Sequence, residues 1–278
     1  MKTVVASVLH PQSTPYWGEF FDSVAAQTDL NFELLLVRDS VPQPSVNFPV
    51  AVYHLDATGK TISQVRKALL QECIDIGAKI VVLADSDDKM HENRVEKSKK
   101  AILEGASIVF NELVFFPMAQ APVAWLGRRC SAFVGYEDLK EGNCLGFSNS
   151  AFLLEKMPAS VFNIDDQIKV FDWAFYSRFL YSGQRAQFLP EDLTWYRVHD
   201  ENMALFKLEQ AKIESAIFIK IQHYKDLIGL IPWAKEKYEE YEKLQKWLEL
   251  DPKNWKAYIK KLNSLDQKKY MWWEAVHP

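Results

Sequence analysis

The sequence lacks any apolar run long enough to cross a bilayer. Its longest apolar stretches, such as Ile80–Ala84, have the length of a strand, far short of the roughly 20 residues that a membrane-spanning helix needs. The run at Thr3–Leu9 is too short for the core of a signal peptide and predicts a buried strand instead. We therefore expect a cytoplasmic protein, either free or peripheral to the inner face of the membrane.

Cysteine and glycine are also scarce, and the chain has no excess of positive charge. The three cysteines are an odd number without metal-type spacing, which argues against a disulfide scaffold and a structural zinc site. With 10 glycines and 12 prolines among 278 residues, and 13% aromatic residues, the chain is neither disordered nor fibrous in composition. A formal net charge of −4 argues against nucleic acid as the main partner.

What the first 110 residues do contain is an alternation of strand and helix patterns. Strand-like runs lie at Val4–Leu9, Phe32–Val37, Val50–Leu55 and Ile80–Ala84, and helical spacing at Trp17–Ala26, Ile62–Ile76 and Glu92–Glu104. Strands separated by helix-length crossovers predict a mainly parallel sheet covered on both faces, that is, an α/β domain. Residues 118–145 break this rhythm and predict a loop or short antiparallel strands, whereas Phe171–Ser182 is again helical and ends at Gly183.

The composition changes after about residue 205. Residues 207–278 hold 14 Lys against 11 Asp and Glu, so this part is +3 and the remainder carries −7. Helical stripes predict about three helices, with Asp251–Pro252 capping the last of them. The stripes are Ile213, Ile217, Ile221, Tyr224 and Ile228, then Tyr238, Tyr241, Leu244 and Leu248. We expect these helices to pack on the rest of the chain; a homodimer interface or contact with an anionic membrane surface stays open.

The most informative segment is Ile80–Asp88, an apolar strand that runs into Asp85, Asp87 and Asp88. Ligands in open α/β sheets bind at the carboxyl ends of strands, and clustered carboxylates there suit Mg²⁺ or Mn²⁺ bridging to a phosphate. The plainer alternative is a solvated acidic turn before the next helix. Asp39 ends a second strand, and it opens onto the same edge of the sheet if both strands are parallel. Arg66 on the intervening helix could face a diphosphate there.

In their order along the chain, these segments resemble the family 2 glycosyltransferases with the GT-A fold. The segments that carry the resemblance are Ser23–Thr28, Phe32–Asp39, Val65–Leu69, Leu83–Asp88, Phe171–Trp173 and Trp195–Asp200, the fourth resembling the DxD motif of the family. The similarity spans roughly residues 3–202. It implies a GT-A-like catalytic domain over residues 1–205, with a nucleotide-binding half to about 110 and an acceptor half after it, followed by a helical region at 206–278.

The resemblance implies roles for single residues. Asp39 would recognise the nucleotide base, most often uracil, and Asp85 would contact the ribose or the metal. Asp87 would hold Mn²⁺ or Mg²⁺ against the diphosphate, with Asp88 as a close alternative. His199 would be a further metal ligand or a diphosphate contact.

Asp172 would be the general base that takes the proton from the acceptor hydroxyl in an inverting transfer. Phe171 stands where the family usually has Glu, and Arg38 where an acidic residue is common; Asp165 and Asp166 are rival bases. Residues placed where the fold would line an acceptor or sugar pocket are Trp125, Arg128, Arg129, Asn143 and Trp173.

The function implied is a metal-dependent, inverting transfer of a sugar from a nucleotide-sugar, most often a UDP-sugar, to a glycan or lipid-linked acceptor, as in bacterial surface polysaccharide synthesis. A catalytically silent module that binds a sugar-nucleotide or a protein is an alternative, supported by Phe171. A nucleotidyltransferase is disfavoured, because His10–Thr14 stands where a glycine-rich phosphate loop would follow the first strand.

Overall fold

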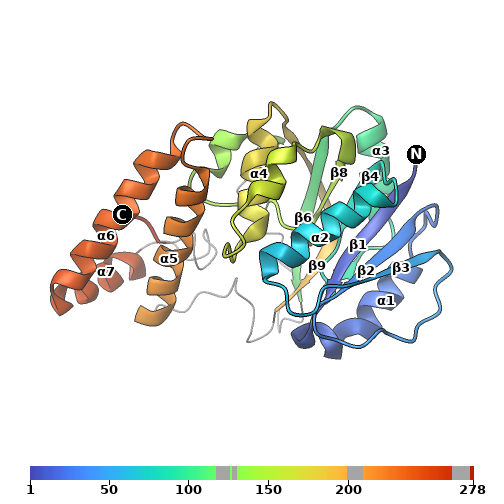
Figure 1. Cartoon of the computed structure of the whole chain (residues 1–278), viewed down its shortest axis with the longest axis horizontal. Coiled ribbons are helices and arrows are strands. Elements are labelled where there is room, and N and C mark those ends of the chain that lie inside the picture. Colours follow the sequence, from blue (N-terminus) through green and yellow to red (C-terminus); the bar gives the residue numbers. More distant parts are fainter. Residues whose placement is uncertain (117–125, 127–129, 199–208, 265–275) are drawn as a thin grey trace.

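A nine-stranded mixed sheet forms the centre of the chain (Figure 1). The computed structural model describes residues 1–116, 126, 130–198, 209–264 and 276–278. The strands are β1 Thr3–Leu9, β2 Glu33–Arg38, β3 Val52–Asp56, β4 Ile80–Leu83, β5 Lys89–Met90, β6 Ile108–Phe116, β7 Phe133–Val134, β8 Ser150–Leu153 and β9 Ala186–Arg197. Their order is β3-β2-β1-β4-β8-β6-β9-β5, with β7 paired to β9.

The first four strands in this order are parallel, as the alternation of strand and helix predicts. β8 runs antiparallel to both neighbours, β4 and β6, whereas β6 and β9 pair in parallel. The antiparallel insertion of β8 follows no periodicity that the sequence shows, because its four residues are too few to carry a pattern.

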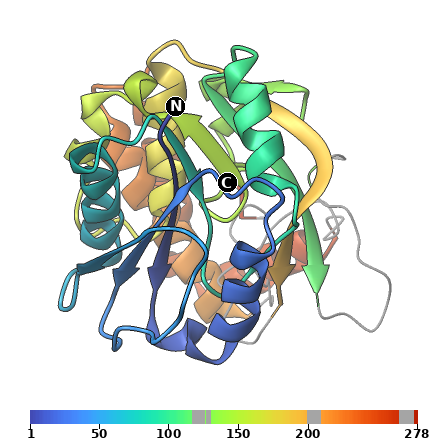
Figure 2. The same ribbon diagram turned by 90° about the vertical axis from the view of Figure 1, so that its right-hand side faces the viewer.

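Helices cover both faces of the sheet, as Figures 1 and 2 show. The α-helices are α1 Trp17–Ala25, α2 Ile62–Asp75, α3 Arg94–Leu103, α4 Phe171–Tyr181, α5 Gln210–Leu227, α6 Ala234–Leu250 and α7 Pro252–Asn263. Short 3₁₀ segments lie at η1 Pro11–Tyr16, η3 Tyr136–Leu139, η4 Leu154–Lys156 and η5 Ala159–Asn163. All seven residues of β1 are buried, and they alternate between two cores. Val4 and Ala6 pack in the core under α2 and α4, and Val5 and Leu9 in the core under α1 and α3.

The three predicted C-terminal helices are present, and Asp251 caps α7 as expected. Its side chain accepts a hydrogen bond from the backbone N of Lys253 at 2.8 Å, with Pro252 in the first helical position. The predicted stripe of α5 is correct for Ile213, Ile217 and Tyr224 but wrong for Ile228, which is exposed. Ile228 leaves the stripe because the helix ends at Leu227. The buried face of α5 also includes Ala216, Lys220, His223 and Leu227.

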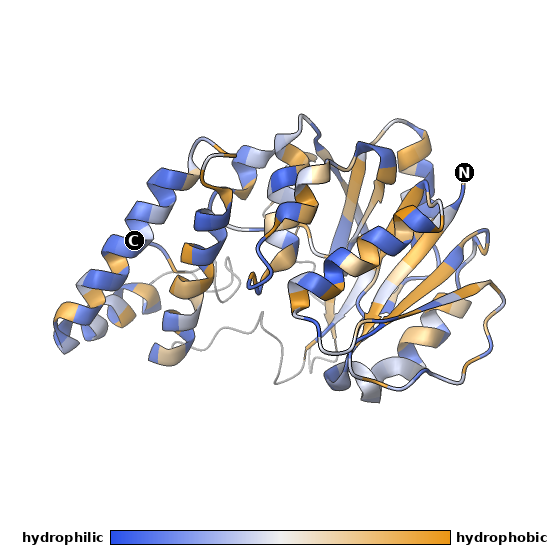
Figure 3. Ribbon diagram, viewed as in Figure 1, coloured by the Kyte–Doolittle hydropathy of each residue, from blue (hydrophilic) through white to orange (hydrophobic). Residues whose placement is uncertain are grey.

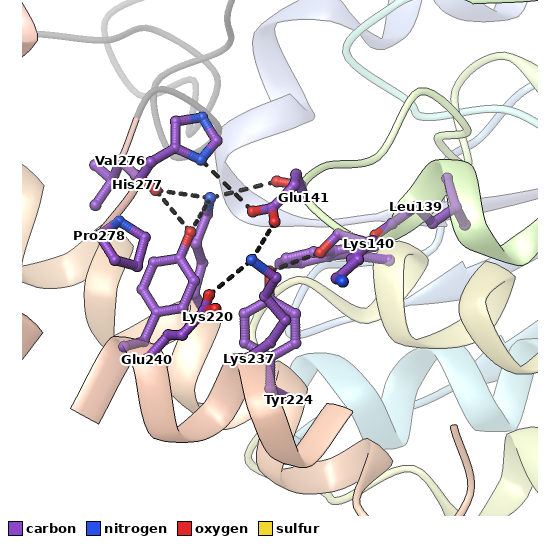
Figure 4. A network of polar contacts seen from close by, with 12 residues as sticks. Leu139, Lys140, Glu141, Lys220, Tyr224, Lys237, Glu240, Val276, His277 and Pro278 are labelled. Carbon is purple, nitrogen blue, oxygen red and sulfur yellow. Dashed lines mark hydrogen bonds and ion pairs between the residues drawn. The ribbon is translucent and has the colours of Figure 1, made fainter. Parts of the chain in front are cut away.

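A polar network ties these helices to the segment Leu139–Glu141 of the α/β part (Figure 4). The carbonyl oxygens of Leu139, Lys140 and Glu141 accept hydrogen bonds from side chains that project from helices α4 and α5. The donors are Trp173 Nε1 at 2.8 Å, Tyr224 Oη at 2.8 Å and Lys220 Nζ at 3.3 Å. Lys220 is fully buried and also donates to Tyr241 Oη and to the carbonyl of Val276. The C-terminal helices therefore dock through satisfied polar groups as well as apolar packing.

Among the described helices, none combines the length and the apolar character that a bilayer crossing requires.

Candidate active site

The acidic turn that follows β4 lies at the carboxyl edge of the parallel strands. β4 pairs in parallel with β1, so the chain leaves the sheet at Ala84 beside the end of β1. Arg66 of α2 reaches this turn, and its Nη2 lies 2.7 Å from Oδ1 of Asp85. The Arg66 guanidinium also lies over the ring of Phe147, 4.7 Å from its centroid. Both partners of the Asp85–Arg66 pair keep 20–25% of their side chains exposed, so a ligand could reach them.

Asp88 points into the protein, in contrast to Asp85. It accepts hydrogen bonds from the backbone N of Arg197 at 2.7 Å and from the hydroxyl of Ser148. Burial, followed by the charges of Asp87 and Asp85, raises the pKa of Asp88 well above its usual range. Asp88 is therefore the least accessible of the three aspartates among the predicted metal ligands, and its contacts are those of a supporting carboxylate.

Two buried arginines support the turn, and the sequence analysis did not single out either as a functional residue. Arg94, on the first turn of α3, donates to the carbonyl of Leu83; burial lowers its pKa to about 10, against the opposing influence of Asp88 and Asp85. Arg197 donates from Nε to the carbonyl of Asp87 at 2.7 Å and pairs through Nη2 with Glu19 at 2.9 Å.

The guanidinium of Arg197 is held between two aromatic rings. Its central carbon lies 4.4 Å from the ring centroid of Tyr16 and 4.5 Å from that of Phe116. Arg197 belongs to the Trp195–Asp200 segment, but only the tertiary structure reveals that it contacts the acidic turn.

Asp39 lies at the same edge, as the parallel arrangement predicts. β1 pairs in parallel with both β2 and β4, and the backbone N of Asp39 donates to the carbonyl of Leu9 at 2.8 Å. The next residue, Ser40, has a φ of +59° and donates its hydroxyl to Oδ1 of Asp39 at 3.0 Å. This left-handed turn redirects the chain directly after Asp39.

Asp172 lies on the first turn of α4 and interacts electrostatically with Asp85 and Arg66. Its Oδ1 accepts a hydrogen bond from the backbone N of Trp173 at 2.8 Å. Burial raises the pKa of Asp172 to about 7, and the charge of Asp85 adds to this, whereas the Trp173 N–H and Arg66 oppose it. A carboxylate with a pKa near neutrality is suited to proton transfer.

Space beside Asp172 is kept open by Gly146. A Cβ placed on Gly146 would lie 3.8 Å from Oδ2 of Asp172 and only 3.3 Å from Oδ1 of Asn149. Asn149 Oδ1 in turn accepts a hydrogen bond from the Gly146 N–H at 2.8 Å. The loop before β8 thus approaches the carboxylate with backbone alone.

The rival carboxylates are occupied elsewhere. Asp166 binds Lys67 and Gln64 of α2, and the hydrogen bond from Lys67 is the main reason that its pKa is lowered. Asp165 accepts from the backbone N of Gln167 at 2.7 Å. The geometry therefore favours Asp172 among the three.

The chain shows no match to a known protein family, or to a curated protein, at the level of sequence. Solved structures do share its arrangement of strands and helices. The structure of residues 1–349 of S. aureus TarS superposes with a TM-score of 0.62 at 13% identity, over 91% of this chain and 74% of that one. The complex of the same protein with UDP-GlcNAc gives 0.60 at 13% identity, over 97% and 77%.

A third solved structure is the mannosyltransferase PcManGT from Pyrobaculum calidifontis in complex with GDP-Man and Mn²⁺. It superposes with a TM-score of 0.57 at 14% identity, over 96% of this chain and 77% of that one. The chain has the GT-A fold. The resemblance that the sequence motifs indicated is thereby confirmed for the fold, and the GT-A fold accounts for the meeting of Asp39 and Asp85 at one edge.

The protein groups of the acidic turn could supply only some of the ligands that a divalent cation needs. Among the described residues, no three His, Cys, Asp or Glu side chains converge as a metal site. Hard cations at phosphate sites, however, take only one or two carboxylates and complete their shell with phosphate oxygens and water. Asp85 and Asp87 supply that number. The pKa of the neighbouring Asp88 is raised first by burial and further by the charges of Asp87 and Asp85, and a cation would offset those two charges.

The predicted pocket residues have mixed outcomes. Trp173 is fully buried and its indole stacks on His223 with ring centroids 3.5 Å apart, so its contacts are those of a core residue. Asn143 forms a turn with Leu145, accepting from its backbone N at 3.1 Å. His199, Trp125, Arg128 and Arg129 lie outside the described residues.

Proposed function

We propose that this protein is a glycosyltransferase that moves a sugar from a nucleotide-sugar to an acceptor hydroxyl. The observation that carries the proposal is the grouping, on a GT-A fold, of Asp39, Asp85 and Asp172, with a pKa of about 7 for Asp172. Solved structures with this fold hold UDP-GlcNAc in one case and GDP-Man with Mn²⁺ in another. That likeness supports a nucleotide-sugar donor and leaves the nucleotide to experiment.

The proposed roles follow the positions of the residues. Asp39 at the end of β2 contacts the nucleotide base, and Asp85, steadied by Arg66, contacts the ribose. Asp87, together with Asp85, holds Mn²⁺ or Mg²⁺, which would offset negative charge on the departing diphosphate. Arg94, Arg197 and Asp88 act as positioning residues behind the turn.

Asp172 is the proposed general base of an inverting transfer. The acceptor hydroxyl oxygen forms a bond to the anomeric carbon while the bond from that carbon to the diphosphate oxygen breaks. The electron pair of the broken bond leaves with the nucleoside diphosphate, and the hydroxyl proton moves to Asp172. A pKa near 7 lets Asp172 be ionised at the start and hold the proton afterwards.

The proposal extends to the setting of the reaction. The acceptor is a glycan or a lipid-linked molecule in bacterial surface glycan synthesis, on the cytoplasmic side of the membrane. This setting is what the resemblance to family 2 glycosyltransferases implies. A homodimer formed through the C-terminal helices also stays a prediction, which depends on the aromatic-rich stripes of those helices.

Thermal stability with UDP, GDP and CDP, each with Mn²⁺ and again with EDTA, tests the donor site. A ligand at 100 times its dissociation constant that binds only the folded chain adds about 2.7 kcal/mol of stability. We expect one nucleotide to stabilise the chain only with Mn²⁺, and the shift to be absent in Asp87→Ala. A chain that no nucleotide stabilises would contradict the proposal.

A measurement of turnover distinguishes a catalytically silent module from an active glycosyltransferase. Hydrolysis or transfer of the matching nucleotide-sugar that is lost in Asp172→Asn, while nucleotide binding is retained, would exclude it. Binding without turnover on a panel of acceptors would favour it. The nucleotidyltransferase alternative has no support in the structure, since η1 Pro11–Tyr16 follows β1 in place of a glycine-rich loop.

A further inference from the structure

The α6–α7 hairpin carries a surface on which lysines and large apolar side chains are exposed together. We propose that this surface binds an anionic lipid bilayer. We call this surface the hairpin face. It is formed by Lys243, Trp247, Leu250, Lys253, Lys256 and Lys260. This inference does not depend on the proposed glycosyltransferase activity.

Helical spacing places these residues on one side of each helix. Lys243, Trp247 and Leu250 follow at i, i+4 and i+7 on α6, and the α7 lysines follow at i, i+3 and i+7. The opposite sides of the helices are buried, through Tyr241 and Leu248 on α6 and Tyr258 and Leu262 on α7. In contrast, Leu250 is 80% exposed and Trp247 is 41% exposed.

The hairpin face carries more lysines than acidic residues. Within the part of the chain that the structure describes, Lys243, Lys253, Lys256 and Lys260 form no ion pair with a carboxylate. Residues 243–261 contain six lysines and two acidic residues, and one of the two, Asp251, is engaged in capping α7. This stretch has a net charge of +4, and the four lysines of the hairpin face are all exposed.

A groove between the two helices adds an apolar floor to this charge. It has a volume of about 530 Å³ and is lined by Leu244 and Trp247 of α6 and Tyr258 of α7, with Lys243 and Lys261 among the residues around it. Glu240, Ala257 and Pro278 complete the lining, so apolar side chains lie beside two lysines and one carboxylate. Exposed lysines beside apolar side chains suit a surface where phosphate headgroups lie above acyl chains. An acidic protein partner would account for the lysines but not for the protruding Leu250.

The turn between α6 and α7 lies toward the same side of the molecule as the carboxyl end of β1. In Figure 1 the turn between α6 and α7 points toward the lower side of the view, and so does η1, which follows the carboxyl end of β1. Figure 3 shows an apolar end of α6 at the same place. Leu250, the last residue of α6, therefore lies at this end of the hairpin.

Sedimentation with vesicles tests the proposal directly. The full chain should bind vesicles of phosphatidylcholine mixed with phosphatidylglycerol, bind pure phosphatidylcholine weakly, and be released by salt. Each lysine near an anionic surface contributes about a fivefold gain in binding, so Lys253→Gln, Lys256→Gln and Lys260→Gln together should weaken it on the order of a hundredfold. Leu250→Ser should weaken binding at low salt with the charge unchanged.

Matched variants separate this surface from a general effect of charge. Lys60→Gln, Lys100→Gln and Lys169→Gln remove the same charge elsewhere, and Leu103→Ser removes an apolar side chain that is 64% exposed on α3. Equal losses in these controls, or no binding of the unaltered chain to phosphatidylglycerol, would overturn the proposal. Sedimentation velocity measures the oligomeric state of the chain. If the chain forms an oligomer that Leu250→Ser dissociates, and does not bind vesicles, the proposal is overturned and the hairpin face is a contact between copies of the chain.

Discussion

At the scale of single residues, the shape of the acidic turn depends on Arg197. One side chain binds the carbonyl of Asp87 and the carboxylate of Glu19, while its backbone N–H binds Asp88. Arg197→Lys keeps the charge but loses the planar fork that serves both partners. We expect it to lower stability by about 1–3 kcal/mol and to weaken nucleotide binding at least tenfold, as measured by thermal melting and titration calorimetry.

Lys97→Met is the matched control for Arg197. The Nζ of Lys97 pairs with Glu191 at 2.9 Å, but both side chains are at least 40% exposed, so its loss should change the stability far less than Arg197→Lys does. Unchanged nucleotide affinity in Arg197→Lys would show that the turn keeps its shape without the guanidinium.

The raised pKa of Asp172 links activity to pH. Because the residue must be ionised to accept a proton, kcat/KM should rise with pH and level off above about 7. Asp172→Asn should reduce kcat by about 10²-fold or more and leave nucleotide affinity within a factor of two to three. A pH–rate profile and nucleotide titration measure the two effects separately.

The same pKa predicts an opposite effect of Asp172→Asn on stability. Between the unfolded value of roughly 3.9 and the folded value of about 7, the folded chain holds a proton that the unfolded chain has released. Stability contributed by this group therefore falls as pH rises through that window. Asparagine cannot ionise, so the variant should melt higher than the unaltered chain at about pH 8 and nearly the same at about pH 4.

Asp166→Asn serves as a control with the reverse sign. The hydrogen bond from Lys67 lowers the pKa of Asp166, so its stabilising contribution is present above the unfolded value and is lost as pH falls. This variant should melt lower than the unaltered chain at neutral pH. Identical pH dependence of the two variants would contradict the assignment of Asp172 as the half-buried carboxyl group that holds a proton near neutral pH.

At the scale of elements, the segment Leu139–Glu141 joins the C-terminal helices to the loop beside Asp172. Lys220 is fully buried within this joint and donates to the carbonyls of Glu141 and Val276 and to the hydroxyl of Tyr241. Lys220→Met leaves buried acceptors without this donor. We expect a loss of about 2–4 kcal/mol in unfolding free energy, measured by denaturant titration.

Lys235 on the same helical region provides the comparison for Lys220. Its side chain is 75% exposed and lies 4.0 Å from Glu239, so Lys235→Met should change stability by less than about 0.5 kcal/mol. Similar losses in both variants would mean that helix propensity, and not the buried network, dominates.

At the scale of the whole molecule, one apolar core runs from the sheet into the C-terminal helices. Residues of β1, α2 and α4 belong to the same packed cluster as Ile213, Tyr241 and Tyr258. Although residues 206–278 differ in charge and composition, we expect the chain to unfold in one transition. Circular dichroism and tryptophan fluorescence should report the same midpoint.

Separate midpoints in that experiment would support an independent helical domain beginning at about residue 206. The continuous core predicts in addition that a chain ending at residue 205 is far less stable than the full chain, because it exposes the face of Trp173 that stacks on His223.

The local elements, and the order of the candidate site residues along the chain, could be predicted from sequence patterns alone. Periodicity predicted β1, α2, α4 and the capped start of α7, because each depends on neighbours within one or two turns. Asp85 follows one apolar strand and Asp39 follows another. This pattern predicted that the two carboxylates lie at the same edge of the sheet. The topology rule for parallel strands suffices for that inference, since it needs no side-chain contacts.

Which carboxylates are accessible, and which residues bind them, depends on the tertiary structure. Asp85 and Asp88 are alike in sequence context, yet one pairs with Arg66 near solvent and the other is enclosed by Ser148 and Arg197. Those partners lie 60 and 109 residues away from Asp88, so no local pattern could assign them. The pKa of Asp172 likewise follows from burial and from Asp85, which are properties of packing and not of spacing along the chain.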